Sequence, residues 1–269
     1  MERRGDNGRR AVGGDGMASN VWAKSSDIIV RTLGLDTEPV AVFLLKRDQD
    51  RDRVPVHAFK AVTGHRYCQA LMRARHGEAV LIEPGALACP AASAVFGFRD
   101  LPATLASGQG LVGFGIVSKP DTGREMFEGM VHLPPGTLAG IALGPLASAP
   151  ALPDVVVVEG PPEPLMWLAL ADVNRSGGQR RSGNTAVLQG TCVDVTLIPY
   201  LEQRLNFSLG CYGCREATDL APSEAVLGFP GALLEPLAQS LQELNVKAIP
   251  RSRSKSVWRS HVAASSSEG

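Results

Sequence analysis

Cys211 and Cys214 stand at C-x-x-C spacing in the segment NFSLGCYGCREATD, and they are the residues best suited to chemistry in this chain. Gly210 and Gly213 flank them, and glycine permits the positive φ angles that a sharp turn requires. Such a turn brings two sulfur atoms towards one point, as in a metal-binding knuckle or a redox-active thiol pair. Arg215 follows directly, and we expect its positive charge to favour the thiolate over the thiol.

Three further cysteines, Cys68, Cys89 and Cys192, lie far from this pair in the sequence. Cys68 falls near the start of a predicted helix, where unpaired amides and the helix dipole favour a thiolate, and Arg66 lies beside it. Cys89 precedes Pro90 at the predicted start of another helix. The ordinary alternative for each is a small buried core residue, because free cysteine often fills that role. Only the fold can decide whether the five thiols meet.

The composition is that of an ordinary globular protein, with 269 residues, 44% hydrophobic residues and equal numbers (27 each) of basic and acidic side chains. This balance gives no electrostatic reason to expect nucleic acid or an anionic membrane as a partner. No apolar run is long enough to span a bilayer, and the charged, glycine-rich N-terminus does not resemble a secretory signal. We therefore expect a cytoplasmic protein, in which cysteines are better candidates for metal binding or redox chemistry than for disulfides.

The chain divides into a glycine-rich segment at residues 1–20, expected to be disordered, a single globular domain at 21–249, and a basic, serine-rich segment at 250–269, also expected to be disordered. Helices are predicted over 64–76 and 162–175, and another is predicted to begin at a cap formed by Ser25 or Ser26. Apolar runs at VAVFLLK, AVLIEP, 140–146 and 154–159 predict buried strands, and the unbroken apolar character of the last two is typical of parallel pairing. The alternation indicates an α/β or α+β fold with a mixed sheet.

Two stretches resemble each other weakly. AVLIEPGALACPAASAVFGF and TAVLQGTCVDV each combine a short predicted strand, a glycine, a cysteine and a predicted helix, with Cys89 and Cys192 in corresponding positions. This similarity predicts two similar halves, 21–135 and 136–249, packed into one globule with the cysteines near their junction.

Several blocks together resemble the ArCR family of bacteria and archaea, a domain of unknown function. The blocks occur in the order EPVAVFLL, HRYCQALMRAR, CPAASAVFGF, PDVVVVEGPPEPLMWL and SLGCYGCRE before GFP, between about Ser25 and Asn245. The resemblance implies little about activity, because the family is itself poorly characterised.

The residues favour a cysteine-bound metal or iron–sulfur centre with a redox or cofactor-related role, in which the partner is an unknown small molecule or redox protein. The predicted ligands are the five thiols, and the predicted cofactor-binding cations are two arginines: Cys68, Cys89, Cys192, Cys211 and Cys214, with Arg66 and Arg215. Zinc is the other metal considered, and His65 or His76 could then join a mixed site. The alternatives are a non-enzymatic protein that binds a small molecule, and a thiol redox enzyme that uses the C-x-x-C pair. Hydrolase motifs such as G-x-S-x-G and H-E-x-x-H are absent from the sequence, and GQGLVGFG does not follow a strand as a dinucleotide-binding loop would.

Overall fold

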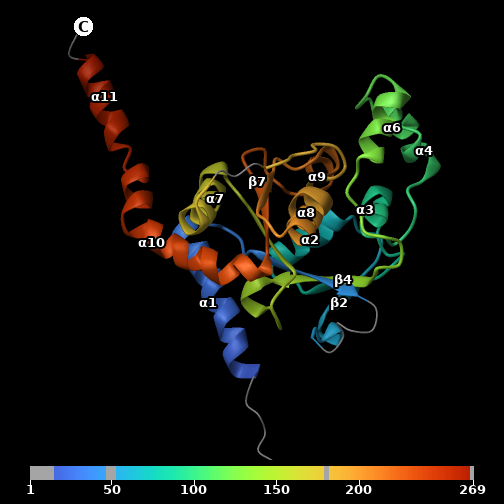
Figure 1. Cartoon of the computed structure of the whole chain (residues 1–269), viewed down its shortest axis with the longest axis horizontal. Helices are drawn as coiled ribbons and strands as arrows, with labels where there is room; N and C mark the ends of the chain where they lie inside the picture. The colour runs from blue at the N-terminus through green and yellow to red at the C-terminus, as the bar shows by residue number, and fades with distance from the viewer. Residues whose placement is uncertain (1–14, 47–52, 179–181, 267–269) are drawn as a thin grey trace, which may run out of the picture.

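The computed structural model describes residues 15–46, 53–178 and 182–266 and shows an α/β fold built on one mixed sheet (Figure 1). The strands are β1 (Val40–Lys46), β2 (Lys60–Val62), β3 (Val80–Ile82), β4 (Leu138–Pro145), β5 (Val155–Gly160), β6 (Asn206–Ser208) and β7 (Ala225–Pro230). The α-helices are α1 (Asp15–Leu33), α2 (Tyr67–Arg75), α3 (Pro90–Val95), α4 (Ala103–Ala106), α5 (Gln109–Gly113), α6 (Pro120–Glu128), α7 (Pro162–Ser176), α8 (Ile198–Glu202), α9 (Tyr212–Ala217), α10 (Leu234–Arg253) and α11 (Ser256–Ser266). A π-helical segment, η3 (Gly190–Leu197), precedes α8.

The sheet has the strand order β2-β3-β4-β1-β5-β7-β6, and β2 with β3 is its parallel pair. The strands β4 and β5, whose apolar character predicted parallel pairing, both lie antiparallel to β1, so that prediction was wrong. Their apolar runs have a different cause, because helices cover both faces of the sheet and bury every second side chain on each side.

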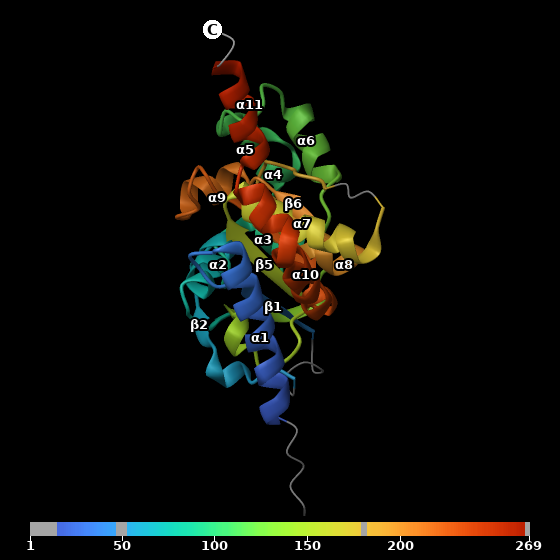
Figure 2. The same cartoon turned by 90° about the vertical axis from the view of Figure 1, so that its left-hand side faces the viewer.

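The two faces can be followed along β1. Val42 and Leu44 belong to a core shared with α2, α3 and η3, whereas Ala41 and Phe43 belong to a second core shared with α1, α7 and α10. This period-two alternation is what a pleated strand between two helical layers requires. The layers on either side of the sheet are seen in Figure 1 and, turned by 90°, in Figure 2.

The helical segment η3 packs tightly on the sheet. A Cβ atom at Gly228 in β7 would collide with the carbonyl oxygen of Val195 in η3, which explains a glycine in the middle of a buried strand. The apolar run TAVL before η3, expected to be a strand, forms no strand; Ala186 and Leu188 there adopt positive φ angles of 58° and 48°. The strand β7 pairs with β5 on one side and with β6 on the other, and the sequence patterns did not indicate β6.

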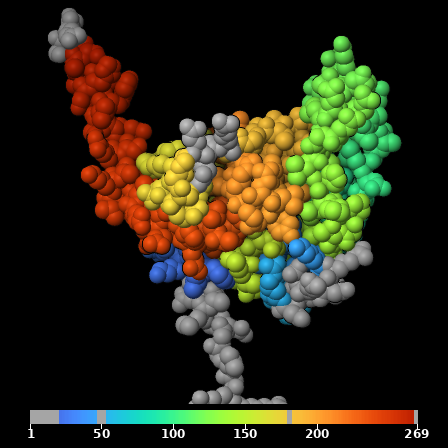
Figure 3. All heavy atoms as spheres, viewed as in Figure 1, coloured from blue at the N-terminus to red at the C-terminus, as the bar shows by residue number. Residues whose placement is uncertain are grey.

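The lobe, residues 101–131 with α4, α5 and α6, stands out from the body of the protein beyond α3 (Figures 1 and 3). Gly108 lets two parts of the lobe approach closely, because a Cβ atom there would lie 2.6 Å from the backbone nitrogen of Arg124 and its φ of +78° favours glycine. The lobe joins the main core through Leu105, Leu111 and Phe127.

Both ends of the described chain differ from the sequence-based expectations. Residues 15–20, predicted to be disordered, begin α1, while the rest of that predicted segment lies outside the described residues. Ser25 and Ser26 are buried inside α1 and do not cap it. The C-terminal segment, also predicted to be disordered, is helical in α10 and α11, and Arg253 fixes the end of α10 through an ion pair with Glu163 at 3.1 Å.

The strands of the two predicted halves are interleaved, because β4 of the second segment lies between β3 and β1 of the first. The chain from 21 to 249 thus shares one sheet, and the similarity of the two segments stays a prediction. Among the described helices none combines the length and the apolar character that crossing a membrane requires.

Candidate functional site

Three of the five cysteines form a buried sulfur cluster. Cys68 comes from the first turn of α2, Cys211 is the N-cap of α9 and Cys214 lies within α9. The Sγ atoms of Cys211 and Cys214 are 3.0 Å apart, which is too long for a disulfide bond of about 2.05 Å, and all five cysteines are free. Residues separated by most of the chain therefore meet at one point.

Cys214 is the centre of this cluster. Its sulfur is in hydrogen-bonding contact with the thiols of Cys211 and Cys68, and the hydroxyl of Thr191 lies 3.4 Å from it. These contacts lower the pKa of Cys214 well below the usual value for a thiol, because they stabilise its charged form. The same hydrogen bonds, together with burial, raise the pKa of Cys68 and of Cys211. The three thiols therefore titrate as a coupled group, in which the pKa of Cys214 is lowered and those of Cys68 and Cys211 are raised.

The remaining two cysteines face the same space. Cys89 is half-buried at the N-cap of α3, and Cys192 is buried in η3 with its thiol directed to the carbonyl of Leu188 at 3.9 Å. Burial raises the pKa of Cys192, and the neighbouring Cys89 and Cys214 raise it further. All five cysteines line one cavity of about 350 Å³. The structure therefore answers the question that the sequence left open, because the fold brings the five thiols to one site.

The backbone around the cluster is tightly packed. Gly190, the first residue of η3, lies directly against the C-x-x-C turn, and a Cβ atom there would be 2.6 Å from the backbone nitrogen of Cys211. Asp194 in η3 binds the next segments, accepting hydrogen bonds from the backbone N–H of Thr185 at 3.1 Å and the hydroxyl of Ser208 at 2.7 Å. The π-helical geometry, which is rare and frequent at functional sites, thus sets the position of both Cys192 and the turn.

This packing makes Gly190→Ala a test of the turn. Because the obstructing atoms belong to the backbone, the added methyl group must push the Cys211 turn away, and we expect a loss of about 1–3 kcal/mol in the free energy of unfolding. Urea denaturation measures it. Gly183→Ala, in the preceding segment with open space around its Cβ position, is the control and should change stability by less than about 0.5 kcal/mol. Equal stabilities of the two variants would show that the turn does not press on Gly190.

The two arginines predicted to bind a cofactor have different surroundings. Arg66 lines the cavity, and its guanidinium donates to the carboxylate of Glu216 at 2.9 Å and to the carbonyl of Gly213 at 3.3 Å. Arg215 is not among the lining residues. Its guanidinium donates to the carbonyls of Leu209, Ala221 and Glu224, so it holds the loop around α9 together. The geometry gives Arg215 a structural role and no contact with the cavity, which corrects the expectation that it binds a cofactor.

The two histidines considered as zinc ligands lie elsewhere. The Nδ1 atom of His65 is 3.0 Å from the carbonyl of Thr63, and the Nε2 atom of His76 is 2.7 Å from the carboxylate of Asp219. Neither histidine lines the cavity.

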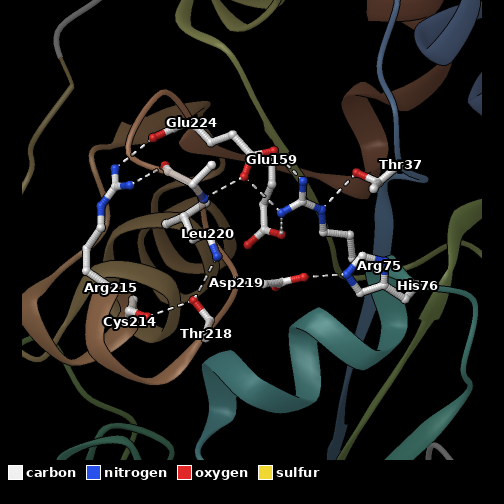
Figure 4. Close-up of polar contacts among 11 residues, drawn as sticks. Thr37, Arg75, His76, Glu159, Cys214, Arg215, Thr218, Asp219, Leu220 and Glu224 are labelled. Atoms are coloured by element: carbon white, nitrogen blue, oxygen red, sulfur yellow. Dashed lines mark hydrogen bonds and ion pairs between the residues drawn. The ribbon is translucent and has the colours of Figure 1, made fainter.

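A buried polar network lies behind the cluster and was not indicated by the sequence patterns (Figure 4). Arg75, on the same helix as Cys68, donates to Thr37 at 2.9 Å and forms ion pairs with Glu224 and with Glu159, the latter at 3.4 Å. Neither carboxylate oxygen of Glu159 has a hydrogen-bond partner among the described residues. Burial raises the pKa of Glu159 to about 8 against the opposing effect of Arg75.

The network is linked to the C-x-x-C helix through the loop that follows it. The hydroxyl of Thr218 donates to the carbonyl of Cys214 at 2.7 Å and accepts from the backbone N–H of Leu220 at 3.3 Å (Figure 4). Glu224, further along this loop, accepts from the backbone of Ala221 at 2.9 Å and from Arg75. The loop is therefore fixed to α2, and the relative position of Cys68 and Cys214 is fixed with it.

The thiols also have to be judged as metal ligands. Two sulfurs bound to one zinc ion at about 2.3 Å in tetrahedral geometry are about 3.8 Å apart, so Cys211 and Cys214 would separate by somewhat less than 1 Å on binding. As they stand, the described side chains contain no group of three or more His, Cys, Asp or Glu arranged to hold an ion. The donor set fits a soft metal in kind and number.

The sequence was compared with known proteins. The model of a family described as "Uncharacterised ArCR" matches residues 28–240, which include all five cysteines. A protein of Methanocaldococcus jannaschii, itself described as uncharacterised, is 26% identical over 145 residues, which are 54% of this chain and 61% of that protein. The match thus spans less than two thirds of this relative. No solved structure matches the chain.

Proposed function

This chain belongs to the ArCR family, and we propose from the convergence of its thiols that it binds a metal ion or an iron–sulfur centre through cysteine. The observation that carries the proposal is the placement of five free cysteines around one cavity, three of them buried in contact with one another. Four thiolates are the usual ligand set of an iron–sulfur cluster and of many structural zinc sites.

The charge of the cluster favours a bound metal ion over a set of thiols that binds no ion. Buried thiols lose their second and third protons only with a compensating positive charge nearby. The arginines next to the cysteines in sequence compensate it poorly, because Arg66 is paired with Glu216 and Arg215 does not line the cavity. A cation placed among the sulfurs would compensate the charge and displace the protons, as metal binding to cysteine does.

The residues have distinct tasks in this proposal. Cys68, Cys211 and Cys214 would hold the centre, and Cys89 or Cys192, which line the same cavity, would complete it. The hydroxyl of Thr191 would donate to the sulfur of Cys214, and hydrogen bonds to ligating sulfur raise the reduction potential of a cluster. A bound cluster would supply one-electron transfer, whereas zinc would supply a Lewis acid.

The test is purification without oxygen, followed by a visible spectrum and assays for iron, zinc and acid-labile sulfide. We expect stoichiometric metal in the unmodified protein and a loss of most of it in Cys211→Ser and in Cys89→Ser, with both variants still folded. His76→Ala is the control, since His76 lies on an exposed ion pair outside the cavity, and it should keep full metal content. Full metal content in both cysteine variants would refute the shared site.

A thiol redox enzyme is the second candidate, because Cys214 has a lowered pKa and Cys211 lies 3.0 Å away. The thiolate of Cys214 would attack a disulfide substrate and release one thiolate, and Cys211 would then displace the second by forming the Cys211–Cys214 disulfide. Metal-free protein whose two thiols are oxidised by a small disulfide such as oxidised glutathione would favour this candidate over the metal centre.

A further inference from the structure

The cavity extends well beyond the sulfur atoms. Besides the cysteines, its lining includes four residues of the lobe: Pro102, Thr104, Leu105 and Phe114. None of these side chains is a ligand for a soft metal, so an ion or cluster held by the thiols would leave this part of the cavity free. A closed structural metal site has no such adjoining space. The whole cavity, thiols included, has a volume of about 350 Å³, which is at the lower end of the range of small-molecule pockets.

We propose that this part of the cavity binds a small, uncharged and largely apolar organic molecule, held between the cysteine centre and the lobe. The proposal rests on the proposed function in one respect, because it places the molecule directly beside the metal. It names the kind of ligand that the site would take in addition to its centre.

The charge of the ligand follows from the lining. The wall is formed mainly by carbon atoms of alanine, proline, leucine and aromatic side chains, and its charged pair, Arg66 with Glu216, is already neutralised at 2.9 Å. A charged ligand would lose hydration without gaining a free partner there, at a cost of several kcal/mol. An uncharged, apolar molecule loses little hydration free energy, and burial of its apolar surface stabilises the complex.

The entrance supports the same conclusion. Of the three exposed aromatic side chains in the described part of the chain, two line this cavity: Phe114 from the end of α5 and Tyr212 from α9, with 56% and 46% of their surfaces exposed. They come from the lobe and from the C-x-x-C helix, which lie on different sides of the space. A molecule between them would cover apolar surface that is otherwise in water, and aromatic faces are the typical walls of ligand pockets.

The probe for the experiment is indole, which is uncharged, apolar and small enough for the cavity, with the anion indole-3-acetate as the charged comparison. Binding to the anaerobically purified protein is measured by saturation-transfer NMR and equilibrium dialysis. Indole should bind, and indole-3-acetate should bind at least about tenfold more weakly. Equal or tighter binding of the anion would overturn the assignment of an uncharged ligand.

A pair of variants tests the location. Thr104 is exposed on α4 and lines the cavity, so Thr104→Trp should fill the space and weaken indole binding at least about tenfold. Ala106→Trp places the same side chain on the same short helix outside the cavity and should leave binding within about twofold. Phe114→Ala, which removes wall surface without adding bulk, should also weaken binding, whereas Trp258→Ala, at an exposed aromatic residue on α11, should not.

The outcomes separate the two proposals. Metal content should be the same in Thr104→Trp, Ala106→Trp and the parent protein, since none of these changes touches a thiol. Metal-loaded protein that does not bind indole, or that binds it equally well with Trp at position 104, would refute the ligand pocket and leave the metal centre standing. Metal-free protein that binds indole in a manner sensitive to Thr104→Trp would support the pocket and refute the metal centre.

Discussion

Replacement of Arg75 by methionine should destabilise the protein by about 3–5 kcal/mol, because it leaves the largely buried carboxylate of Glu224 without its counter-ion. The Arg75 side chain is only 7% exposed and lies between Glu159 and Glu224, whose side chains are 1% and 14% exposed. It also donates to Thr37 at 2.9 Å, so its loss leaves a second polar group without a partner. Methionine fills a similar length of space, so the change in packing is small beside the electrostatic loss.

The control for this variant lies two residues away on the same helix. Arg73 forms an ion pair with Glu78 at 2.5 Å, but Glu78 is 46% exposed, and exposed pairs contribute about 0–1 kcal/mol. Urea denaturation of Arg75→Met, Arg73→Met and the parent protein should therefore show a large loss in the free energy of unfolding for Arg75→Met and a small one for Arg73→Met. Similar small losses in both variants would mean that water reaches Arg75 and that the network is not sealed.

The pH dependence of stability should reveal Glu159. Its pKa is raised from the usual 4.5 to about 8 by burial, so between these values the folded state binds more protons than the unfolded state. Stability must then fall as pH rises through this interval, and by pH 8 the accumulated loss from this group is on the order of 3–5 kcal/mol. Glu159→Gln removes this contribution, so the variant should gain on the parent protein progressively from pH 5 to pH 8.

Glu224 provides the opposite case in the same network. Its hydrogen bonds from Arg75 and from the backbone of Ala221 lower its pKa in spite of partial burial. The stability that it contributes is therefore present above its unfolded pKa and is lost as pH falls through its folded pKa. Chemical denaturation of both glutamine variants at each pH from 3 to 8 tests the two predictions, because the effect of Glu224 appears only below its unfolded pKa of 4.5. A Glu159→Gln variant with the same pH dependence as the parent would show that Glu159 is ionised in the folded protein throughout.

Other charged groups face Glu159, and the measurement has to allow for them. Arg75 opposes the raised pKa, while Glu224, Asp219 and the thiolate of Cys214 add to it. The contribution of Cys214 ties the network to the cysteine cluster: a metal that neutralises the sulfurs should lower the pKa of Glu159. Denaturation of metal-loaded and metal-free protein should therefore be recorded separately.

The elements that were predicted correctly from the sequence are those with a long apolar pattern within their own residues. VAVFLLK forms β1 and the segment 162–175 forms α7, because each has a continuous apolar run or an apolar stripe of sufficient length. The pairing direction of β4 and β5 was predicted wrongly, since burial on both faces produces the same apolar run in parallel and antiparallel sheets. The strand β6 has only three residues, and such a length carries no detectable period.

The site was predictable in its residue types and not in its surroundings. The five cysteines stood out by type, and the family resemblance, confirmed by the match over residues 28–240, contained them all. The role of Arg215 was misjudged because closeness in sequence to Cys214 says nothing about where a long side chain points. Glu159 offered a signal that was overlooked, namely a carboxylate at the end of four consecutive valines in a buried strand. The lobe wall consists of ordinary apolar residues, which no motif distinguishes.

The distance along the chain between Cys68 and Cys214 also governs when the cluster can be assembled during synthesis. The cluster includes residues of α9, which is synthesised only after β1 to β6 and the lobe. Cys68 therefore has no cluster partner during most of translation. A cross-link through sulfur at this point would close a loop of well over a hundred residues, and such a loop restricts the unfolded chain by roughly 4–5 kcal/mol in the chain-entropy model. The sulfur cluster can therefore form only late in synthesis, and a chain that ends before Cys211 would carry its other three cysteines without the pair that completes the cluster.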